Sequence, residues 1–408
     1  MIVGVRDSKA RAMPVDKPSV VREPQPQRGY NRAMRQRWLG GLSTREFLRQ
    51  HWQKRPLLAR AVGFAPAGMP QRTKLLALAC RSDVESRLVT RHAGRWRLEH
   101  GPFRRRRFAS LPARDWSLLV NGVNLQVPAA ERLLRRFDFL PQARLDDVMV
   151  SYAAPGGGVG PHCDSYDVFL LQGPGRRLWR LQRARRFTLL ADAPLRLIAD
   201  FAPEEEYLLE PGDLLYLPPG WAHDGIALEP CFTYSVGCRA PRGAELALAM
   251  LDYLHERGLP EAEFRDPALR PAVRSAQIGA PMLGFARRVL RRLRWTSRDV
   301  QRVLGRHLTT PKPHVVFRPP RRLLGRAAFL RQLVHRTVVL DARSALLYRG
   351  STFFLNGEDV ASRPAQRRPL ARLADRRRGA GAALARAGLG AQLYAWYGRG
   401  YLDLERSA

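Results

Sequence analysis

Short apolar runs alternate with turn residues through the middle of the chain, between about residues 86 and 240. Each run is shorter than an ordinary helix, and Gly and Pro residues separate the runs. Many short strands between such turns are typical of an all-β barrel or a double sheet. The runs that carry this prediction are SRLVTRH, WSLLVNGV, DDVMVSYA, YDVFLLQG, RLWRLQ, EYLLEPGDLLYLPPG and FTYSVGCR.

Helical patterns flank this strand-rich stretch. Before it, Ser43 is followed three residues later by Glu46, a capping-box pattern that predicts a helix running to about Trp52. A strand is expected over Leu57 to Ala61. After about residue 242, the segments GAELALAMLDYLHERG and LGFARRVLRRLRW have helical spacing. The second is apolar on one face and cationic on the other, which favours a helix packed within a dimer over one bound to RNA.

The last ninety or so residues combine helices with short strands. RRLLGRAAFLRQLVHR predicts a helix, TVVLDARSALLYRGSTFFLNGEDV predicts strands with a turn at Asn356-Gly357, and ARLADRRRGAGAALARAG predicts another helix before an aromatic terminus. This order resembles a winged-helix module, although fold alone does not decide function. The predicted organisation is a disordered basic leader (1–36), a catalytic domain (37–241), a helical dimerisation region (242–317) and a winged-helix-like domain (318–408).

The charge of the chain is strongly basic. Its 408 residues carry a formal net charge of +34, and only five of the 70 basic residues are lysines. Such a field attracts RNA, DNA or acidic surfaces. An arginine skew is also what a GC-rich genome would produce, so the charge is compatible with ribosomal RNA contact without establishing it.

Location is constrained by what the chain lacks. It has no apolar run long enough for a membrane span, and its first residues contain no apolar segment typical of a secretory signal. The four cysteines show no CxxC spacing, which makes a structural zinc site or a disulfide framework improbable. A cytoplasmic location is therefore expected.

A candidate metal site begins after a glycine-rich turn, in Pro155-Gly-Gly-Gly-Val-Gly-Pro-His162-Cys-Asp164. Residues i and i+2 of a strand project to the same face, so His162 and Asp164 can reach one metal. A third ligand is predicted in Gly212-Asp-Leu-Leu-Tyr-Leu-Pro-Pro-Gly-Trp-Ala-His223, which follows the second cupin motif. Two imidazoles and one carboxylate suit Fe(II) and leave the opposite side open for a co-substrate and dioxygen.

An oxygenase of this kind needs a buried cation for the distal carboxylate of 2-oxoglutarate. Gly175-Arg-Arg177-Leu-Trp-Arg180 follows as the next strand, with Arg177 on one face and Arg176 and Arg180 on the other. Only one face can be interior. We predict that Arg177 binds the carboxylate and that Arg176 faces solvent, with Arg176 and Arg180 as the next candidates.

At these residues the chain resembles the JmjC-type cupin oxygenases. It is most similar to the bacterial ribosomal oxygenases, which hydroxylate an arginine of large-subunit ribosomal protein L-sixteen. The resemblance is dense from residue 38 to residue 242 and covers the remainder mainly in layout. The matching stretches include His51-Trp-Gln-Lys-Arg-Pro-Leu-Leu, Glu99-His-Gly-Pro-Phe103, Trp116-Ser-Leu-Leu-Val, Asp146-Asp-Val-Met149, Tyr166-Asp-Val-Phe and Tyr234-Ser-Val-Gly.

The resemblance implies a double-stranded β-helix of the cupin type, then a helical dimerisation region and a C-terminal winged helix. It implies a homodimer that uses Fe(II), 2-oxoglutarate and dioxygen to hydroxylate the β-carbon of an arginine. It also implies substrate contacts: Asp147 at the guanidinium, Met149 beside the aliphatic stem, Tyr166 stacked on the arginine and Ser235 as a hydrogen-bond partner. A carboxylate and an aromatic face are what a guanidinium prefers.

Three positions depart from the family. Near the position of Ala153, related enzymes have a serine that helps to hold the co-substrate. Thr233 stands where the family usually has asparagine, and Cys163 stands where a bulkier residue is usual. These differences concern co-substrate affinity more than the reaction. The basic leader is also foreign to the family, and a misassigned start codon would explain it.

Two alternatives stay open. One is an oxygenase that acts on a ribosomal-protein histidine or a transfer-RNA base. The other is a non-catalytic cupin regulator that binds nucleic acid through its winged helix. An acidic pocket at Asp147 favours a cationic side chain over a base, and an intact set of three metal ligands disfavours a pure binding protein.

Overall fold

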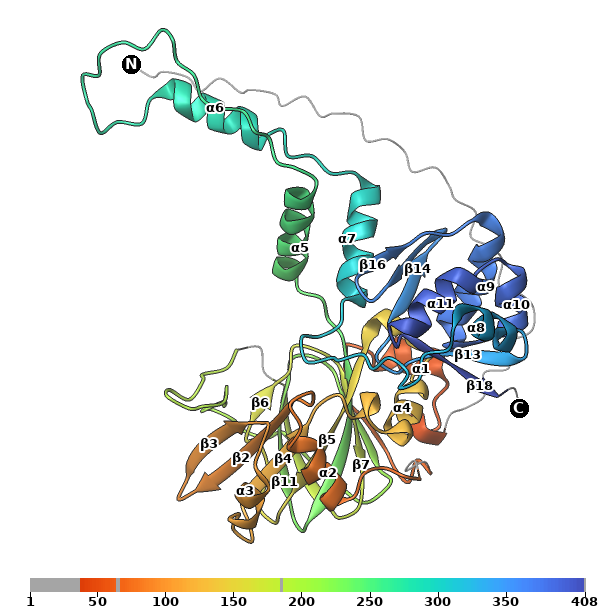
Figure 1. Cartoon of the computed structure of the whole chain (residues 1–408). Coiled ribbons are helices and arrows are strands. Elements are labelled where there is room, and N and C mark those ends of the chain that lie inside the picture. The colour runs from red at the N-terminus through yellow and green to blue at the C-terminus, as the bar shows by residue number, and fades with distance from the viewer. Residues whose placement is uncertain (1–36, 64–66, 184–185, 407–408) are drawn as a thin grey trace. The chain divides into compact units, whose positions relative to one another are not determined.

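Twelve strands build two antiparallel sheets, which face each other in the middle of the chain (Figure 1). The larger sheet contains β1 (Leu57–Ala59), β2 (Ser86–His92), β3 (Arg95–His100), β4 (Trp116–Val120), β5 (Leu145–Ala153), β7 (Val168–Gln172), β10 (Leu214–Leu217) and β12 (Cys231–Cys238). The smaller sheet contains β6 (His162–Cys163), β8 (Arg177–Arg183), β9 (Glu205–Leu209) and β11 (Trp221–Ala227).

This computed structural model describes residues 37–63, 67–183 and 186–406. The predicted leader, residues 1–36, lies outside the described residues. The strand order is β1-β10-β7-β12-β5-β4-β2-β3 in the larger sheet and β6-β11-β8-β9 in the smaller. After β5 the chain passes back and forth between the sheets, with β8 and β9 as a hairpin in the smaller one, as in a double-stranded β-helix. The expected fold class is confirmed.

Short helices surround these sheets. They are η1 (Arg37–Leu39), α1 (Thr44–Gln50), α2 (Arg72–Ala79), α3 (Arg105–Ala109), η2 (Val123–Leu125), α4 (Pro128–Arg135) and η3 (Gln142–Arg144). The capping box is present, since Ser43 Oγ accepts from the Glu46 N–H and the Glu46 carboxylate accepts from the Ser43 N–H. The strand-rich interpretation of residues 86–240 missed α4, although its first residue is Pro128, a common first helical residue.

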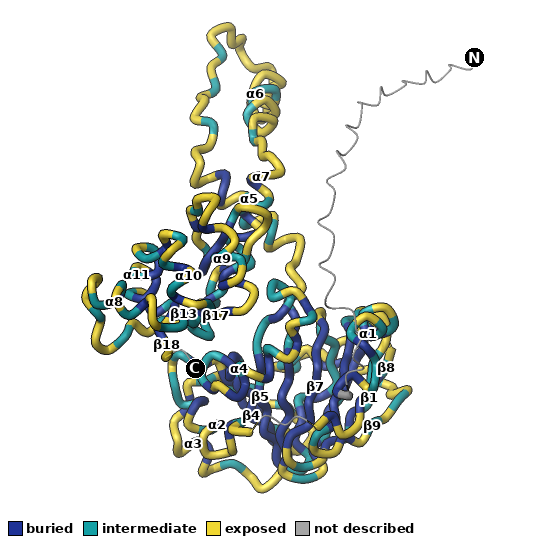
Figure 2. The backbone as a smooth tube through the Cα atoms, turned by 90° about the vertical axis from the view of Figure 1, so that its right-hand side faces the viewer, coloured by how far each residue is buried: buried dark blue, intermediate teal, exposed yellow. Residues whose placement is uncertain are grey.

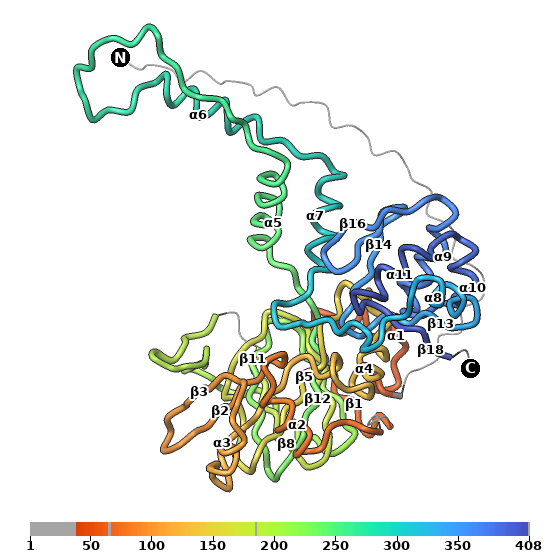
Figure 3. The backbone as a smooth tube through the Cα atoms, viewed as in Figure 1, coloured from red at the N-terminus to blue at the C-terminus, as the bar shows by residue number. Residues whose placement is uncertain are grey.

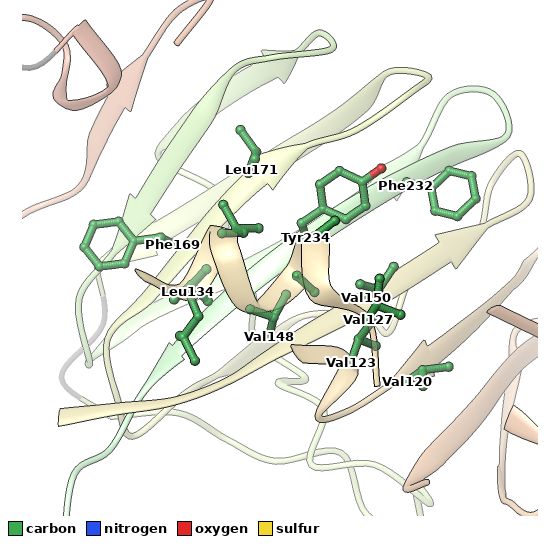
Figure 4. Packing of buried hydrophobic residues seen from close by; sticks show 14 of the residues in the cluster. Val120, Val123, Val127, Leu134, Val148, Val150, Phe169, Leu171, Phe232 and Tyr234 are labelled. Carbon is green, nitrogen blue, oxygen red and sulfur yellow. The ribbon is translucent and has the colours of Figure 1, made fainter. Parts of the chain in front are cut away.

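Side-chain alternation divides the larger sheet into two faces. On β5, Val148 and Val150 point to the outer face and pack with Leu134 of α4 and Val123 of η2 (Figure 4). On β12, Phe232 and Tyr234 lie on that same outer face. The residues between them point into the space between the sheets. One large hydrophobic cluster therefore lies outside the larger sheet. On its inner face, β7 and β10 pack a second apolar cluster against the smaller sheet, whereas β5 and β12 place polar side chains there.

The C-terminal module has its own core and two three-stranded sheets, β17-β13-β18 and β14-β15-β16. Its strands are β13 (Arg336–Leu340), β14 (Leu346–Arg349), β15 (Thr352–Leu355), β16 (Glu358–Val360), β17 (Arg378–Ala380) and β18 (Leu402–Arg406). Its helices are α8 (Arg326–Leu333), α9 (Pro364–Arg376), α10 (Gly381–Arg386) and α11 (Gly390–Gly398).

Two details of this module test the sequence predictions. The turn at Asn356-Gly357 joins β15 to β16 as expected, with φ positive at both residues (51° and 88°). The single helix predicted from residue 371 onward is wrong. Arg377 takes a left-handed conformation (φ 56°) that ends α9, and β17 separates α9 from α10. The sequence has no glycine at this stop, so periodicity alone did not reveal it.

Three helices connect the two modules: α5 (Gly243–Glu256), α6 (Ala280–Leu290) and α7 (Ser297–Thr309). Figure 3 traces this segment, and Figure 2 shows that most of it between α5 and α7 is exposed. The sequence analysis missed α7, which a Thr296–Asp299 capping box starts. Gly305 of α7 lies directly against the Phe354 ring of β15. None of the described helices combines the length and apolar character that crossing a membrane requires.

A fully buried carboxylate joins three separate parts of the catalytic domain. Asp167 accepts hydrogen bonds from Tyr216 Oη (2.6 Å), Gln53 Nε2 (2.9 Å) and Arg144 Nη2 (3.2 Å). Tyr216 Oη in turn accepts from the Gln53 N–H at 2.8 Å. Burial and the Asp167 carboxylate raise the pKa of Tyr216, so this phenol stays a donor. The network therefore links Gln53, after α1, and Tyr216, on β10, to Asp167, which directly precedes β7.

Replacing Asp167 by Ala should destabilise the fold by roughly 3–5 kcal/mol, because the Tyr216 hydroxyl and part of the Arg144 charge would lose their buried acceptor. Tyr216→Phe removes one donor and should cost only about 1 kcal/mol. Urea denaturation followed by circular dichroism measures both free energies of unfolding. Equal losses in the two variants would contradict a central role for the carboxylate.

Candidate metal centre

Three side chains converge between the sheets. One ligand atom from each of His162, Asp164 and His223 lies within 4.8 Å of the other two. Strand β6 pairs with β11 so that His162 stands opposite His223, and their rings are 4.3 Å apart between centroids. Asp164 Oδ2 lies 3.7 Å from His223 Nε2. Strand β6 ends at Cys163, so Asp164 projects from the first residue after the strand, not from within it as expected.

Backbone carbonyls orient both imidazoles. His162 Nδ1 lies 2.8 Å from the Gly160 oxygen, and His223 Nδ1 lies 3.1 Å from the Trp221 oxygen. A proton on each Nδ1 would donate to these carbonyls and leave each Nε2 lone pair free for a metal. Burial, together with the neighbouring His162, lowers the pKa of His223 to about 4, so this imidazole is neutral near pH 7. Two imidazoles and a carboxylate fit a divalent transition metal.

The glycine-rich turn is explained by how closely it passes β11. The Gly156 N–H donates to the Ala227 oxygen at 2.8 Å, and the Ala227 N–H donates to the Gly157 oxygen at 2.9 Å. A Cβ on Gly158 would lie 2.6 Å from the Gly225 oxygen, which no side chain could tolerate. The turn therefore delivers His162 directly onto the strand that carries His223.

Arg177 enters the same cavity from β8. Its side chain is buried, its guanidinium lies 5.8 Å from the Trp179 ring centre, and its Nε and Nη2 have no hydrogen-bond partner among the described residues. Arg176 pairs instead with Glu229 (3.0 Å) and Arg180 with Glu206 (2.9 Å), both at the surface. Of the three arginines, Arg177 is the one that is buried in the cavity with guanidinium donors left unpaired among the described residues.

Two serine hydroxyls in the cavity that Arg177 enters, those of Ser117 and Ser151, were missed by the sequence analysis. Ser117 of β4 is buried, lines the cavity, and its Oγ lacks a hydrogen-bond partner among the described residues. Ser151 and Thr233 stand opposite each other on β5 and β12 and line the cavity too. Ala153 pairs with Ser117 across β4 and β5, which places Ser117 beside the position where the family serine is absent. Only pairing between distant strands reveals this neighbour.

The cavity has a volume of about 790 Å³, and the four predicted substrate residues all line it. Asp147, Met149 and Ser235 point inward from β5 and β12, and Tyr166 is 40% exposed. Asp147 Oδ2 accepts from the Gly122 N–H at 2.7 Å. Burial raises the pKa of Asp147, while the Lys312 ammonium opposes that rise.

Lys312 is a cavity residue that the motifs did not indicate. It comes from the segment after α7, and its Nζ lies 2.9 Å from Asp146 Oδ2. Arg239 Nε approaches the other oxygen of Asp146 at 3.2 Å. Two cations thus neutralise Asp146, and Asp147 carries the carboxylate that is available to a further cation.

Comparison with known proteins agrees with this architecture. Residues 132–246 match the model of the JmjC domain, and residues 292–403 match that of the ROXA-like winged helix. The chain is 43% identical to the ribosomal protein uL16 3-hydroxylase of Escherichia coli over 57% of its own length and 62% of that enzyme. It is 37% identical to a probable ribosomal oxygenase of Haemophilus influenzae over 49% of its own length and 50% of that protein. The matches thus span only half to three-fifths of these two relatives.

The structural match is longer. The solved structure of the Escherichia coli ribosomal oxygenase YcfD in complex with cobalt and 2-oxoglutarate superimposes with a TM-score of 0.74 at 34% identity. It covers 88% of this chain and 98% of that one. The fold, the JmjC domain and the winged helix all agree over this length. The chain therefore belongs to the ribosomal oxygenase family of JmjC-domain proteins.

Proposed function

We propose that this protein is an Fe(II)- and 2-oxoglutarate-dependent hydroxylase that acts on an arginine side chain of large-subunit ribosomal protein uL16, also called L-sixteen. The observation that carries the proposal is the convergence of His162, Asp164 and His223 in one cavity with the buried Arg177 fork. The cobalt and 2-oxoglutarate complex of YcfD and the uL16 3-hydroxylase activity named for the Escherichia coli relative support it.

The three ligands would hold Fe(II). When bound, this metal would supply dioxygen activation coupled to decarboxylation of 2-oxoglutarate, which hydroxylation of an unactivated carbon requires. Arg177 binds the distal carboxylate through its Nε and Nη2 edge. The Ser117 hydroxyl is placed to add a hydrogen bond in place of the serine that Ala153 replaces. The backbone carbonyls of Gly160 and Trp221 hold the two imidazoles in the tautomer that leaves Nε2 free.

The inner faces of β5 and β12 present the substrate groups. Asp147 binds the guanidinium, Met149 contacts the aliphatic stem, Tyr166 stacks on the guanidinium plane and Ser235 donates or accepts a hydrogen bond. Because Arg239 and Lys312 already neutralise Asp146, the charge of Asp147 selects a cationic side chain over a neutral base or imidazole. This supports arginine over a histidine or a transfer-RNA base.

We also propose that the protein is a cytoplasmic homodimer. The segment from α5 to α7 exposes many large apolar side chains, which is unusual for a monomer surface. A second copy that packs against this segment would bury them. The exposed residues are Leu248, Leu251, Leu259, Leu269, Val273, Ile278, Met282, Leu283, Leu290 and Trp295.

A uL16 peptide from the same organism, incubated with the enzyme, Fe(II), 2-oxoglutarate and ascorbate, should gain one oxygen on an arginine. Mass spectrometry measures this gain. Asp164→Ala should bind metal weakly and lower turnover by more than roughly 100-fold, because losing even an outer-shell partner costs about 10- to 100-fold. The exposed Asp138→Ala is the matched control. Full activity of Asp164→Ala would refute the metal site, and succinate without peptide oxidation would overturn the substrate.

Arg177→Ala should raise the 2-oxoglutarate concentration needed for half-maximal rate by roughly 100-fold, since a buried charge-assisted pair is worth about 2–5 kcal/mol when one partner is removed. Peptide binding should stay near normal. The control is Arg176→Ala, which removes a surface cation from the adjacent residue. Titration of succinate formation with 2-oxoglutarate distinguishes them, and an unchanged requirement in Arg177→Ala would move the carboxylate site elsewhere.

Substituting both Leu248 and Leu251 by Asp should convert a dimer into a monomer, because charge would be buried at the interface. Sedimentation equilibrium of the full chain gives the mass. Leu228, which is also exposed but lies between β11 and β12, provides the control Leu228→Asp. A wild-type protein with the mass of one chain would contradict the dimer.

A further inference from the structure

A second cavity, of about 550 Å³, lies between the catalytic domain and the C-terminal module, and it shares no lining residue with the metal cavity. Its walls are unusually rich in arginine. Arg81 and Arg135 come from the catalytic domain, and Arg318 comes from the segment that leads into α8. Arg343 and the consecutive residues 376–378, all arginines, come from the module itself. We call this cavity the arginine cleft.

Carboxylates near the arginine cleft are too few to balance it. Asp83 lies 2.6 Å from Arg81 and 2.6 Å from Arg318, so two cations share it. Glu131 is shared in the same way by Arg135 (2.7 Å) and Arg377 (3.7 Å). Asp341 pairs with Arg343, and Glu405 pairs with Arg378, at 3.1 and 3.4 Å. Among the residues that the structure describes, four carboxylates therefore face seven arginines, which leaves an excess of three positive charges.

Arg377 shows how tightly these cations are held. The left-handed turn that ends α9 directs its side chain inward, where it is only 8% exposed. Its guanidinium donates to the backbone oxygens of Ser344 (2.7 Å) and Asp341 (2.6 Å). Burial and the neighbouring Arg135 lower its pKa to about 10. Because the cleft keeps this charge in place against repulsion, an anion that enters it would be stabilised.

We propose that the arginine cleft binds the phosphodiester backbone of an RNA strand. All its cations are planar guanidinium forks, and such forks match the paired oxygens of a phosphate better than an ammonium does. RNA presents one phosphate for every nucleotide, so arginines at several points along the cleft can act together. Gln126 also lines the cleft, where its Oε1 accepts from Arg81 at 3.0 Å and from Arg343 at 3.3 Å and so holds two of the forks in place.

RNA is a better match than an acidic peptide. The carboxylates of a peptide would need the same spacing as guanidinium groups that are fixed on two different modules. The proposal is independent of the hydroxylase activity, since the cleft lies apart from the metal cavity. The net charge of the whole chain predicts binding to an anionic partner without saying where on the protein it occurs. The junction of the two modules is the place that we propose.

The test compares two charge-matched triple variants of the full chain. The first changes the exposed Arg318, Arg376 and Arg378 to Gln. The control changes the exposed Arg104, Arg105 and Arg106, at the start of α3, to Gln. Fluorescence anisotropy with a short labelled single-stranded RNA gives the affinity at several salt concentrations. The cleft variant should bind roughly tenfold more weakly, with the slope of log affinity against log salt reduced by about 2, as three lost phosphate contacts require.

The control variant should keep its affinity within about twofold of the wild type, and both variants should hydroxylate the uL16 peptide at the wild-type rate if that activity is established. Equal losses in the two variants, or no loss in either, would overturn the proposal. So would a cleft variant that loses binding to a labelled polyglutamate peptide but not to RNA, since the partner would then be an acidic protein. If the triple variant unfolds, Arg318→Gln with Arg378→Gln carries the same test.

Discussion

The antiparallel register between β6 and β11 is the constraint on which the metal centre depends. It places His162 opposite His223, and the side chains of directly opposed residues in such a pair lie on the same face. A slip of one residue would turn one imidazole to the other face of the sheet. The pairing itself is only two residues long, so it relies on the glycine-rich turn that precedes it. That turn is fixed to β11 by the hydrogen bonds that the Gly156 N–H and the Gly157 oxygen make with Ala227, and it has no space for a Cβ at Gly158.

The second constraint is the division of β5 and β12 into two faces. Outward residues of both strands are apolar and pack under η2 and α4, where they supply the stabilising core. Inward residues of these strands do not belong to that core and line the metal cavity, where they could contact a substrate and co-substrate. They are Asp147, Met149 and Ser151 on β5, and Thr233 and Ser235 on β12. The same strands thus hold the fold and present the chemistry without competition between the two roles.

Charge is distributed unequally between the two cavities. In the metal cavity, Asp146 is neutralised by Arg239 and Lys312, so Asp147 is the lining carboxylate besides the candidate metal ligand Asp164 that is left to attract a cation. In the arginine cleft, seven arginines share four carboxylates among the described residues, so cations are in excess. Both arrangements need residues from the C-terminal half of the chain placed against residues from the catalytic domain. The junction between the modules therefore contributes charged side chains to both cavities.

The sequence by itself determined the double-stranded β-helix, the winged-helix-like module and the three converging side chains, because turn residues, strand alternation and the HxD and cupin spacings are local features. Alternation along β8 placed Arg177 and Arg176 on opposite faces, and the tertiary structure shows that the Arg177 face is the interior one. Helices α4 and α7 and the stop at Arg377 escaped the sequence analysis, although two of them carry local signals. Only the tertiary structure decided that Ser117 lies beside Ala153, that Lys312 neutralises Asp146 and that Arg81 shares a cleft with Arg378. These neighbours are far apart along the chain, and strand pairing and packing between modules, which no local pattern encodes, bring them together.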